Sequence, residues 1–291
     1  MRVFVTGREG QLARCLAEVA AARSGFEIIF AGRPAFDLTQ TDAALATVLA
    51  AAPDVIVNAA AYTAVDKAEQ ESEVAFAINR DGAAAMAKAA ARLGVPLVHI
   101  STDYVFSGER RGAYVEADAT GPRTVYGQSK LAGEMAVQEL APQHVILRTS
   151  WVYSAYGQNF VSTMMRLAKE RTTVSVVADQ TGCPTSAHDL AAAVLDIAKA
   201  LQNRPDVKGV FHAAGLGVTT WFEFAAAIFA EMAKHQLPVP QLTPIAAADY
   251  KAAAQRPQNS ALDCRKLKGA FGLELPAWET SLATVVAERL R

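Results

Sequence analysis

Tyr126 and Lys130 stand four residues apart in a segment whose helical periodicity runs to about Leu140. Residues at this spacing share one helix face, so the phenol and the ammonium group can meet. A cation beside a phenol lowers the pKa of the phenol and makes the tyrosine a better proton donor at neutral pH. Thr102, which follows an apolar stretch, can give a second hydrogen bond to a developing oxyanion. Together these side chains predict the reduction of a carbonyl group by a hydride from a nicotinamide cofactor.

A glycine turn near the N-terminus predicts where that cofactor binds. Apolar residues 3–5 indicate a buried strand, and the pattern Gly7-x-x-Gly10-x-x-Ala13 separates it from an amphipathic helix. This spacing is typical of short-chain dehydrogenases. We expect Gly7 to take a positive φ and Gly10 to let a pyrophosphate approach the helix N-terminus. Lys130 can also bond the hydroxyl groups of the nicotinamide ribose.

The end of the second expected strand, residues 26–31, bears on the choice between NADPH and NADH. An acidic side chain there would bind a ribose 2′-hydroxyl, and a basic one would accept a 2′-phosphate. The chain has Gly32 and Arg33 at this place, and its next carboxylate is Asp37. The sequence favours NADPH, with NADH as an alternative; Arg33 is equally interpreted as a solvated loop charge.

These residues need a sheet that brings several strand ends to one edge. Apolar stretches at 3–5, 26–31, 55–57, 97–100 and 145–149 alternate with helical patterns at 12–20, 41–51, 72–93 and 126–140. This alternation predicts an α/β fold with a doubly wound parallel (Rossmann) sheet. Ligands bind such a sheet at its carboxyl edge, where Thr102 is expected.

Beyond Trp151 the alternation loosens. Helical patterns occur at 159–169, 188–201, 221–232 and from 282, and strand patterns at 174–178 and 210–212. We expect a dinucleotide-binding domain made of residues 1–151 and 174–218. A smaller, mostly C-terminal substrate lobe would consist of residues 152–173 and 219–291.

Composition excludes several classes of protein. With 52% hydrophobic and 20% charged residues and a net charge of -1, the chain is globular and has no field for nucleic acid or an anionic membrane. No stretch approaches the roughly 18 apolar residues of a membrane span, and Arg8 and Glu9 interrupt any signal peptide. Three scattered cysteines indicate free thiols in a reducing cytoplasm.

One histidine, His99, falls inside the apolar stretch 97–100. No second metal-binding side chain is spaced near it, so we interpret it as a packed histidine rather than a ligand. No metal site is expected in this chain.

Several longer segments resemble the dTDP-4-dehydrorhamnose reductases, which are extended short-chain dehydrogenases. The resemblance covers essentially the whole chain and is carried by residues 7–12 (GREGQL), 57–69 (VNAAAYTAVDKAE), 101–108 (STDYVFSG), 126–134 (YGQSKLAGE), 148–153 (RTSWVY), 182–185 (GCPT) and 256–260 (RPQNS). Segments 57–69 and 256–260 are more specific than the general dehydrogenase motifs.

The resemblance implies reduction of dTDP-4-dehydro-β-L-rhamnose to dTDP-β-L-rhamnose with NADPH or NADH. It places cofactor contacts at Gly10, Gln11, Leu12, Asp37, Leu38, Ala61, Tyr62, Thr63, Tyr126 and Lys130. It places contacts to the sugar nucleotide at Thr102, Asp103 and Trp151. The last assignment is physically reasonable because a flat indole can lie against a sugar face.

One departure from the family concerns assembly. Some similar reductases join as dimers through Mg²⁺ held by carboxylates, one of which is on the first helix. The corresponding position here is Cys15, beside Arg14, and a thiol and a cation suit Mg²⁺ poorly. We therefore expect a monomer or a weak homodimer without metal.

Two alternatives stay open from the sequence. The chain could be a reductase or epimerase acting on another nucleotide sugar, such as a GDP- or UDP-linked one. It could also be a non-catalytic NADP-binding regulatory subunit, although the presence of Thr102, Tyr126 and Lys130 argues against that.

Overall fold

In the computed structural model of the chain, residues 1–250 and 253–290 are described. The first half alternates strands and helices: β1 (Arg2–Thr6), α1 (Gln11–Ala21), β2 (Glu27–Ala31), α2 (Thr41–Ala51), β3 (Val55–Asn58), α3 (Val65–Ala68), α4 (Ser72–Phe76), the π-helical turn η1 (Ala77–Gly82), α5 (Ala83–Leu93), β4 (Leu97–Thr102), the 3₁₀ turn η2 (Asp103–Val105), α6 (Val125–Leu140) and β5 (His144–Thr149). Every strand and helix expected in this half is present.

The second half has shorter elements, several of which the sequence pattern did not predict. They are β6 (Val152–Tyr153), α7 (Phe160–Glu170), β7 (Thr173–Val177), β8 (Thr181–Gly182), β9 (Thr185–Ser186), α8 (Ala187–Leu201), β10 (Gly209–His212), β11 (Thr219–Thr220), α9 (Trp221–Lys234), β12 (Gln241–Ile245), the 3₁₀ turn η3 (Ala247–Asp249), α10 (Arg265–Phe271) and α11 (Trp278–Arg289). The short strands were missed because two residues carry no periodicity.

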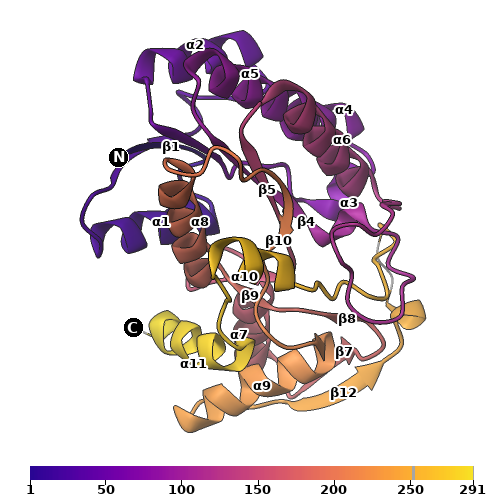
Figure 1. Cartoon of the computed structure of the whole chain (residues 1–291). Coiled ribbons are helices and arrows are strands. Elements are labelled where there is room, and N and C mark those ends of the chain that lie inside the picture. The colour runs from indigo at the N-terminus through magenta and orange to yellow at the C-terminus, as the bar shows by residue number, and fades with distance from the viewer. Residues whose placement is uncertain (251–252, 291) are drawn as a thin grey trace.

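Six parallel strands form the central sheet in the order β10-β5-β4-β3-β1-β2 (Figure 1). This confirms the expected doubly wound parallel fold. The strand order reverses between β1 and β3, and in sheets of this kind the crevice at such a reversal is where ligands bind. The turns that follow β1 and β3 therefore lie at the position expected for a cofactor.

Two helical layers cover the sheet (Figure 1). On one face, α1 packs against α8, and both cover Val3 and Val5 of β1. On the other face, α2, α5 and α6 cover Phe4 and Ile56. Successive residues of β1 thus point into different layers, and both layers are apolar. This is why the strand appears in the sequence as a continuous apolar stretch.

A smaller group of elements lies beside the sheet (Figure 1). Helices α7, α9 and α11 pack around Tyr153, Phe224 and Trp278, and β7 pairs in parallel with β12. β7 falls within the stretch 174–218 that we expected in the dinucleotide-binding domain, but it pairs outside the six-stranded sheet. Its exposed and buried residues alternate, as suits a strand covered on one face only. The division into two domains otherwise stays a prediction.

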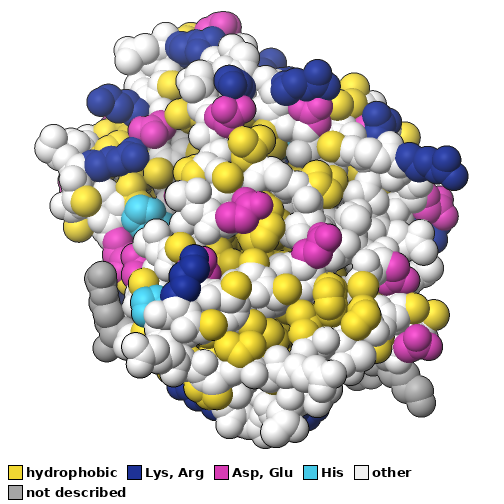
Figure 2. Space-filling model, turned by 90° about the horizontal axis from the view of Figure 1, so that it is seen from below, with side chains coloured by type: hydrophobic (Ala, Val, Ile, Leu, Met, Phe, Trp, Pro, Cys, Tyr) yellow, Lys and Arg dark blue, Asp and Glu magenta, His cyan; other side chains and the backbone are white. Residues whose placement is uncertain are grey.

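Charged side chains of both signs are mixed on the face shown in Figure 2. Lys and Arg side chains lie there beside Asp and Glu, in keeping with the net charge of -1. Across residues 1–250 and 253–290, none of the helices has the length and apolar character needed to cross a membrane.

Candidate active site

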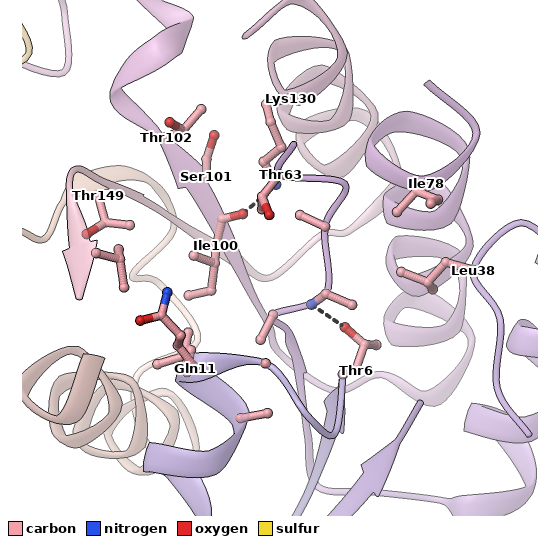
Figure 3. A pocket seen from close by; sticks show the side chains of 18 of the residues that line it. Thr6, Gln11, Leu38, Thr63, Ile78, Ile100, Ser101, Thr102, Lys130 and Thr149 are labelled. Carbon is pink, nitrogen blue, oxygen red and sulfur yellow. Dashed lines mark hydrogen bonds between the residues drawn. The ribbon is translucent and has the colours of Figure 1, made fainter. Parts of the chain in front are cut away.

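A cavity of about 650 Å³ opens along the carboxyl edge of the sheet (Figure 3). It is lined by the turn after β1, the ends of β2 to β5 and the first turns of α6. The predicted site residues that line it are Gly7, Gly10, Gln11, Leu12, Arg33, Asp37, Leu38, Ala61, Thr63, Thr102, Asp103, Tyr126, Lys130 and Trp151. The residues predicted for the cofactor and those predicted for the reaction therefore share one cavity.

The glycine turn has the geometry that an anion needs. Gly7 takes a φ of +91° and donates its N–H to the carbonyl oxygen of Ala31 at 2.7 Å. Gly10 precedes α1 as its N-terminal cap and has no capping side chain. The N–H groups of the first helical turn are therefore free to donate hydrogen bonds. Nothing lies within 4 Å of the point where a Cβ of Gly10 would stand. That open space beside free donors fits a pyrophosphate.

The side chain of Gln11 stands at the start of α1 and points into the cavity (Figure 3). Its Oε1 accepts hydrogen bonds from the Ser154 hydroxyl and from Asn159 Nδ2, each at 2.8 Å. These bonds connect the first helix to the chain after β6 and fix the floor of the cavity.

Charged groups line the end of the cavity beside β2. Arg33 is there as predicted, and Arg8, which the sequence analysis did not single out, lines the same end. A Cβ on Gly32 would stand only 3.0 Å from the Cβ of Arg8, so the glycine lets the arginine lie close to the strand end. Asp37 Oδ1 accepts hydrogen bonds from the N–H and the hydroxyl of Thr39, both at 2.9 Å, and the N–H bond lowers the pKa of the carboxyl.

Tyr62 is the predicted site residue that does not line the cavity. Its hydroxyl donates to Glu71 Oε2 at 2.6 Å. Its backbone N–H and carbonyl are held by the Asn79 side chain at 2.8 and 3.1 Å. The side chain is directed away because it has a carboxylate partner elsewhere, so a contact from Tyr62 to a ligand would have to come from its backbone.

Helix α6 brings Tyr126 against the end of β4. Thr124 caps the helix by accepting the N–H of Gly127 at 3.0 Å. A Cβ on Gly127 would overlap the carbonyl oxygen of Tyr104, so the glycine allows the helix to approach the turn after β4. The rings of Tyr104 and Tyr126 then meet edge to face at 5.5 Å. Tyr126 is 9% exposed and lines the cavity together with Thr102.

Burial raises the pKa of Tyr126 to about 12, and a hydrogen bond with the Thr102 side chain opposes the rise. The predicted lowering of this pKa by Lys130 is therefore wrong for this structure. Instead, Lys130 Nζ donates to the carbonyl oxygen of Ile100 at 2.6 Å (Figure 3) and lies 3.4 Å from His99 Nε2. Tyr126 is thus held as a neutral phenol.

Lys130 is almost fully buried, with 2% of its surface exposed. Burial lowers the pKa of its ammonium group to about 8, and the nearby Glu134 carboxylate opposes this. The amine can therefore change its protonation state within a pH range at which enzymes work.

Asp103 is a second buried group with a displaced pKa. The Thr102 hydroxyl donates to Asp103 Oδ1 at 2.9 Å. Burial raises the pKa of the Asp103 carboxyl to about 6, while hydrogen bonds with the Ser260 and Thr102 side chains oppose the rise. The carboxyl thus orients the threonine and titrates close to neutral pH.

The polar segment 253–260 fastens the C-terminal part of the chain to the same edge of the sheet. Asp66 accepts the N–H of Ala254 at 3.0 Å and a guanidinium N–H of Arg256 at 2.8 Å. The amide of Asn259 donates to the carbonyl oxygens of Arg110 and Gly112 at 2.9 and 2.7 Å. The last residue of the segment, Ser260, is buried and favours the charged form of the Asp103 carboxyl.

Trp151 lines the cavity and takes a φ of +48°, an unusual value for a side chain of its size. Its indole stacks on that of Trp221, with ring centroids 3.4 Å apart and planes 8° apart. A Cβ on Gly182 would overlap the Trp151 indole. One face of Trp151 is therefore already covered by Trp221, a residue that the sequence analysis assigned to a lobe helix but not to the site.

Cys15, the residue of the first helix at which we expected no metal ligand, is a buried thiol. Cys15 is 2% exposed, and burial raises its pKa to about 12, so it stays protonated. The guanidinium group of Arg14 lies over the ring of Tyr156, 3.9 Å from its centroid. Within residues 1–250 and 253–290, no group of three His, Cys, Asp or Glu side chains is placed to hold a metal ion.

Comparisons with known proteins agree over the whole chain. A family profile described as "RmlD substrate binding domain" matches residues 1–291. A dTDP-4-dehydrorhamnose reductase from Sinorhizobium fredii is 51% identical over 291 residues, which is 98% of this chain and 97% of the relative. The crystal structure of dTDP-4-dehydrorhamnose reductase from Bacillus anthracis in complex with NADP has a TM-score of 0.91 at 38% identity, with 99% of both chains covered. The reductase from Clostridium acetobutylicum has a TM-score of 0.93 at 34% identity, with 100% of both chains covered.

Proposed function

The chain belongs to the dTDP-4-dehydrorhamnose reductase family, and from this premise we infer that it reduces the 4-keto group of dTDP-4-dehydro-β-L-rhamnose to give dTDP-β-L-rhamnose. It is an NAD(P)H-dependent oxidoreductase of dTDP-rhamnose biosynthesis. The observation that supports the chemistry best is that Thr102, Tyr126 and Lys130 line the cavity that also contains Gly7 and Gly10.

The cofactor, when bound, supplies the hydride. We propose that its phosphates lie on the N-terminus of α1 and that its adenosine end lies beside β2. The residues assigned to it are Gly7, Gly10, Gln11, Leu12, Arg33, Asp37, Leu38, Ala61, Thr63, Tyr126 and Lys130, with Tyr62 contributing its backbone alone. Arg33 and Arg8 at one end of the cavity favour NADPH, because a 2′-phosphate is better paired with guanidinium groups than a hydroxyl is.

Tyr126 is the proposed proton donor. Its raised pKa keeps the phenol protonated at neutral pH, and Tyr126 and Thr102 line the same cavity. A 4-keto oxygen beside them would receive a hydrogen bond from Tyr126, and a second one from Thr102 once the Thr102 hydroxyl turns from Asp103 toward it, as the oxygen becomes an alkoxide. Tyr126 then transfers its proton to that oxygen and completes the alcohol.

We assign the sugar nucleotide to Thr102, Asp103 and Trp151. Asp103 accepts a hydrogen bond from Thr102 and can also accept one from a sugar hydroxyl. Because Trp221 covers one face of Trp151, the sugar would meet the remaining surface of that indole unless Trp221 moves.

The replacement Tyr126→Phe tests this mechanism. We expect the variant to fold and bind NADPH while kcat falls by about 10²–10⁴-fold, because the proton donor is lost. Turnover is measured as NADPH oxidation in the presence of dTDP-4-dehydrorhamnose. A variant that keeps near-normal turnover would rule out the proton-donor role.

The same assay separates the alternative functions. A dTDP-linked ketosugar should be turned over faster than GDP- or UDP-linked ones, with one NADPH oxidised for each sugar reduced. Turnover of a nucleotide sugar without net NADPH oxidation would indicate an epimerase. NADPH binding with no turnover of any of these sugars would indicate a regulatory subunit.

We further propose that the protein works in the cytoplasm as a monomer or weak homodimer. Cys15, Cys183 and Cys264 are all free thiols, as is usual in a reducing compartment. The buried Cys15 and the stacked Arg14 offer no ligand for a bridging Mg²⁺. Light scattering of the purified protein should give the same mass with Mg²⁺ and with a chelator; a mass that doubles with Mg²⁺ would contradict this.

A further inference from the structure

A continuous line of buried polar groups leads from the end of β1 to Lys130. The N–H of Ala60 donates to Thr6 Oγ1 at 3.0 Å, and the Thr6 hydroxyl donates to Asn58 Oδ1 at 2.7 Å. Asn58 Nδ2 lies 3.0 Å from His99 Nδ1, and His99 Nε2 lies 3.4 Å from Lys130 Nζ. Thr6, Asn58, His99 and Lys130 are each at most 2% exposed.

The directions of these bonds determine which nitrogen of His99 carries the proton. Thr6 Oγ1 already accepts from Ala60, so the Thr6 proton needs an acceptor, and Asn58 Oδ1 is the atom it reaches. The amide of Asn58 must then turn its Nδ2 donors toward His99. His99 Nδ1 accepts, and in a neutral imidazole the proton is on Nε2.

His99 also stays neutral in this setting. Burial, the charge of Lys130 and that of His144 all hold the pKa of His99 well below its usual range. The ring therefore presents an Nε2–H group to Lys130 Nζ. A neutral amine can accept this hydrogen bond, whereas an ammonium group has no lone pair with which to accept it.

The other charged and titratable groups near Lys130 act differently. Glu134, one helical turn further along α6, attracts the ammonium form, but its carboxylate is engaged by Arg148 at 2.7 and 2.9 Å and by Ser101 at 2.5 Å. Tyr126 lies on the same helix face, and Asp103 follows β4 on the cavity side. Among these groups, His99 is placed to stabilise the neutral amine.

We propose that His99 is a positioning residue that holds Lys130 Nζ beside the carbonyl of Ile100 and stabilises its neutral form. The proposal rests on the reductase function inferred above. After Tyr126 has given its proton to the product alkoxide, the Lys130 ammonium group, which lines the same cavity, supplies a proton to the Tyr126 phenolate by way of a water molecule in the cavity. The N–H bond of Lys130 breaks, the O–H bond of Tyr126 forms again, and the neutral amine accepts the Nε2–H of His99. Solvent returns the proton to Lys130 when the product leaves.

The tautomer of His99 can be measured without any turnover. We expect the ¹⁵N chemical shifts of its ring in the purified protein to report a neutral imidazole with the proton on Nε2 between pH 6 and 9. The signals are assigned by their loss in His99→Gln. A proton on Nδ1, or an imidazolium in this range, would overturn the proposal even if the reductase function is correct.

Replacing the ring by Leu tests its effect on Lys130. In the wild type, kcat should fall at high pH as Lys130 loses its proton. In His99→Leu the neutral amine loses its donor, so this fall should move up by about one pH unit, and kcat at pH 7 should drop roughly threefold to tenfold with KM unchanged. In His99→Gln, whose amide can still donate a hydrogen bond, the shift of the pH profile and the loss of kcat should both be smaller than in His99→Leu. If the fall of kcat at high pH occurs in His99→Leu at the same pH as in the wild type, or at a lower pH, the proposal is contradicted.

A matched control separates this effect from loss of stability. His212 of β10 is also a fully buried strand histidine, packed against Phe106 at 5.6 Å, and it does not line the cavity. His212→Leu should leave the pH profile of kcat as in the wild type, and thermal unfolding of both variants measures how much stability each replacement costs. If wild-type protein shows no reductase activity at all, the proposed function fails, and the tautomer measurement still judges the arrangement around His99.

Discussion

Two sets of buried polar side chains share β4 and α6 but hold their charges differently. Glu134 forms an ion pair with Arg148, with hydrogen bonds of 2.7 and 2.9 Å, and accepts the Ser101 hydroxyl at 2.5 Å; the Arg148 and Glu134 side chains are 5% and 0% exposed. The adjacent strand residue Thr102 and the residue one helical turn before Glu134, Lys130, line the cavity, as Ser101 also does, but they are not part of this ion pair. There, burial displaces the pKa values of Asp103 and Lys130 toward neutrality.

The difference shows what each set does. The paired charges compensate one another, so they fix the position of α6 on the sheet and have little chemistry left to perform. Glu134 attracts the Lys130 ammonium group but is itself paired with Arg148, and burial disfavours the charged forms of both Lys130 and Asp103. Displaced pKa values of this kind are typical of groups that exchange protons with a substrate.

The largest expected effect is on activity, from Lys130→Met. Turnover of dTDP-4-dehydrorhamnose should fall by about 10²–10⁴-fold, since the proton source proposed for Tyr126 is removed. The free energy of unfolding at pH 7 should stay within about 1–2 kcal/mol of the wild type, because the folded state no longer has to bury an ammonium group. Chemical denaturation and the NADPH assay measure the two quantities.

The sign of the pH effect gives a further check on this variant. The folded-state pKa of Lys130 is below its ordinary value of 10.5, at about 8, so the wild type should gain stability as the pH rises from about 8 to 10.5. Lys130→Met should lack this gain. The exposed Lys88 serves as the control, because Lys88→Met should change neither activity nor this pH dependence.

Breaking the ion pair between Arg148 and Glu134 should mainly reduce stability, whereas Lys130→Met should mainly reduce activity. Arg148→Met leaves the Glu134 carboxylate buried without its partner and should lower the free energy of unfolding by about 3–5 kcal/mol. Arg166→Met removes an exposed ion pair to Glu170 and should have little effect. Urea denaturation compares the two; equal losses would contradict the distinction between the paired and the cavity sets.

Asp103→Asn should stabilise the protein while it impairs substrate binding. The folded-state pKa of Asp103 is raised from 3.8 to about 6, so the wild type loses stability as the pH rises through this range, and the full cost is present above it. The variant should therefore be more stable by roughly 1–3 kcal/mol at pH 8 but not at pH 4. Thermal unfolding at both pH values checks this, and KM for the sugar nucleotide should rise.

The pKa of Asp263 is displaced in the opposite direction to that of Asp103. Hydrogen bonds from Arg265 lower the pKa of its carboxyl, so its charged form is favoured in the folded protein. Asp263→Asn should therefore reduce stability at pH 8, by an amount that disappears as the pH falls below the usual range for a carboxyl. If Asp103→Asn and Asp263→Asn shift stability in the same direction, the interpretation of the cavity carboxyl is wrong.

The smallest effect is expected from Arg33→Ala, which extends the comparison to an exposed charge. The KM for NADPH should rise about tenfold, because one charge-assisted hydrogen bond is lost. The KM for NADH and the stability of the protein should stay unchanged. An equal rise in both KM values would show that Arg33 does not contact the 2′-phosphate.

Local patterns predicted much of this structure. The strand, glycine turn and helix at the N-terminus are contiguous in the sequence, and Tyr126 and Lys130 share a helix face, so both arrangements follow from spacing alone. The six-stranded sheet follows from the alternation of apolar strands and helices. The pairing of β7 with β12 joins residues about seventy apart, and nothing in either short stretch indicates its partner.

The parts that could not be predicted depend on contacts distant in sequence. His99 was correctly expected to be packed, but its partners Asn58 and Lys130 are 41 and 31 residues away. The raised pKa of Tyr126 reflects the depth at which its ring is buried, which no local pattern reveals. Tyr62 stands in a motif whose neighbours line the cavity, yet its own side chain turns toward Glu71.

The stacked indoles of Trp151 and Trp221 have an optical consequence. They are two of the three tryptophans in the chain, and they face each other from the turn after β5 and the first residue of α9. Electronic coupling between aromatic rings depends steeply on their separation, so any tilt of α9 away from the sheet alters the near-ultraviolet circular dichroism and the emission of the pair. The protein thus carries its own unlabelled reporter for any change in the position of α9 relative to the sheet edge.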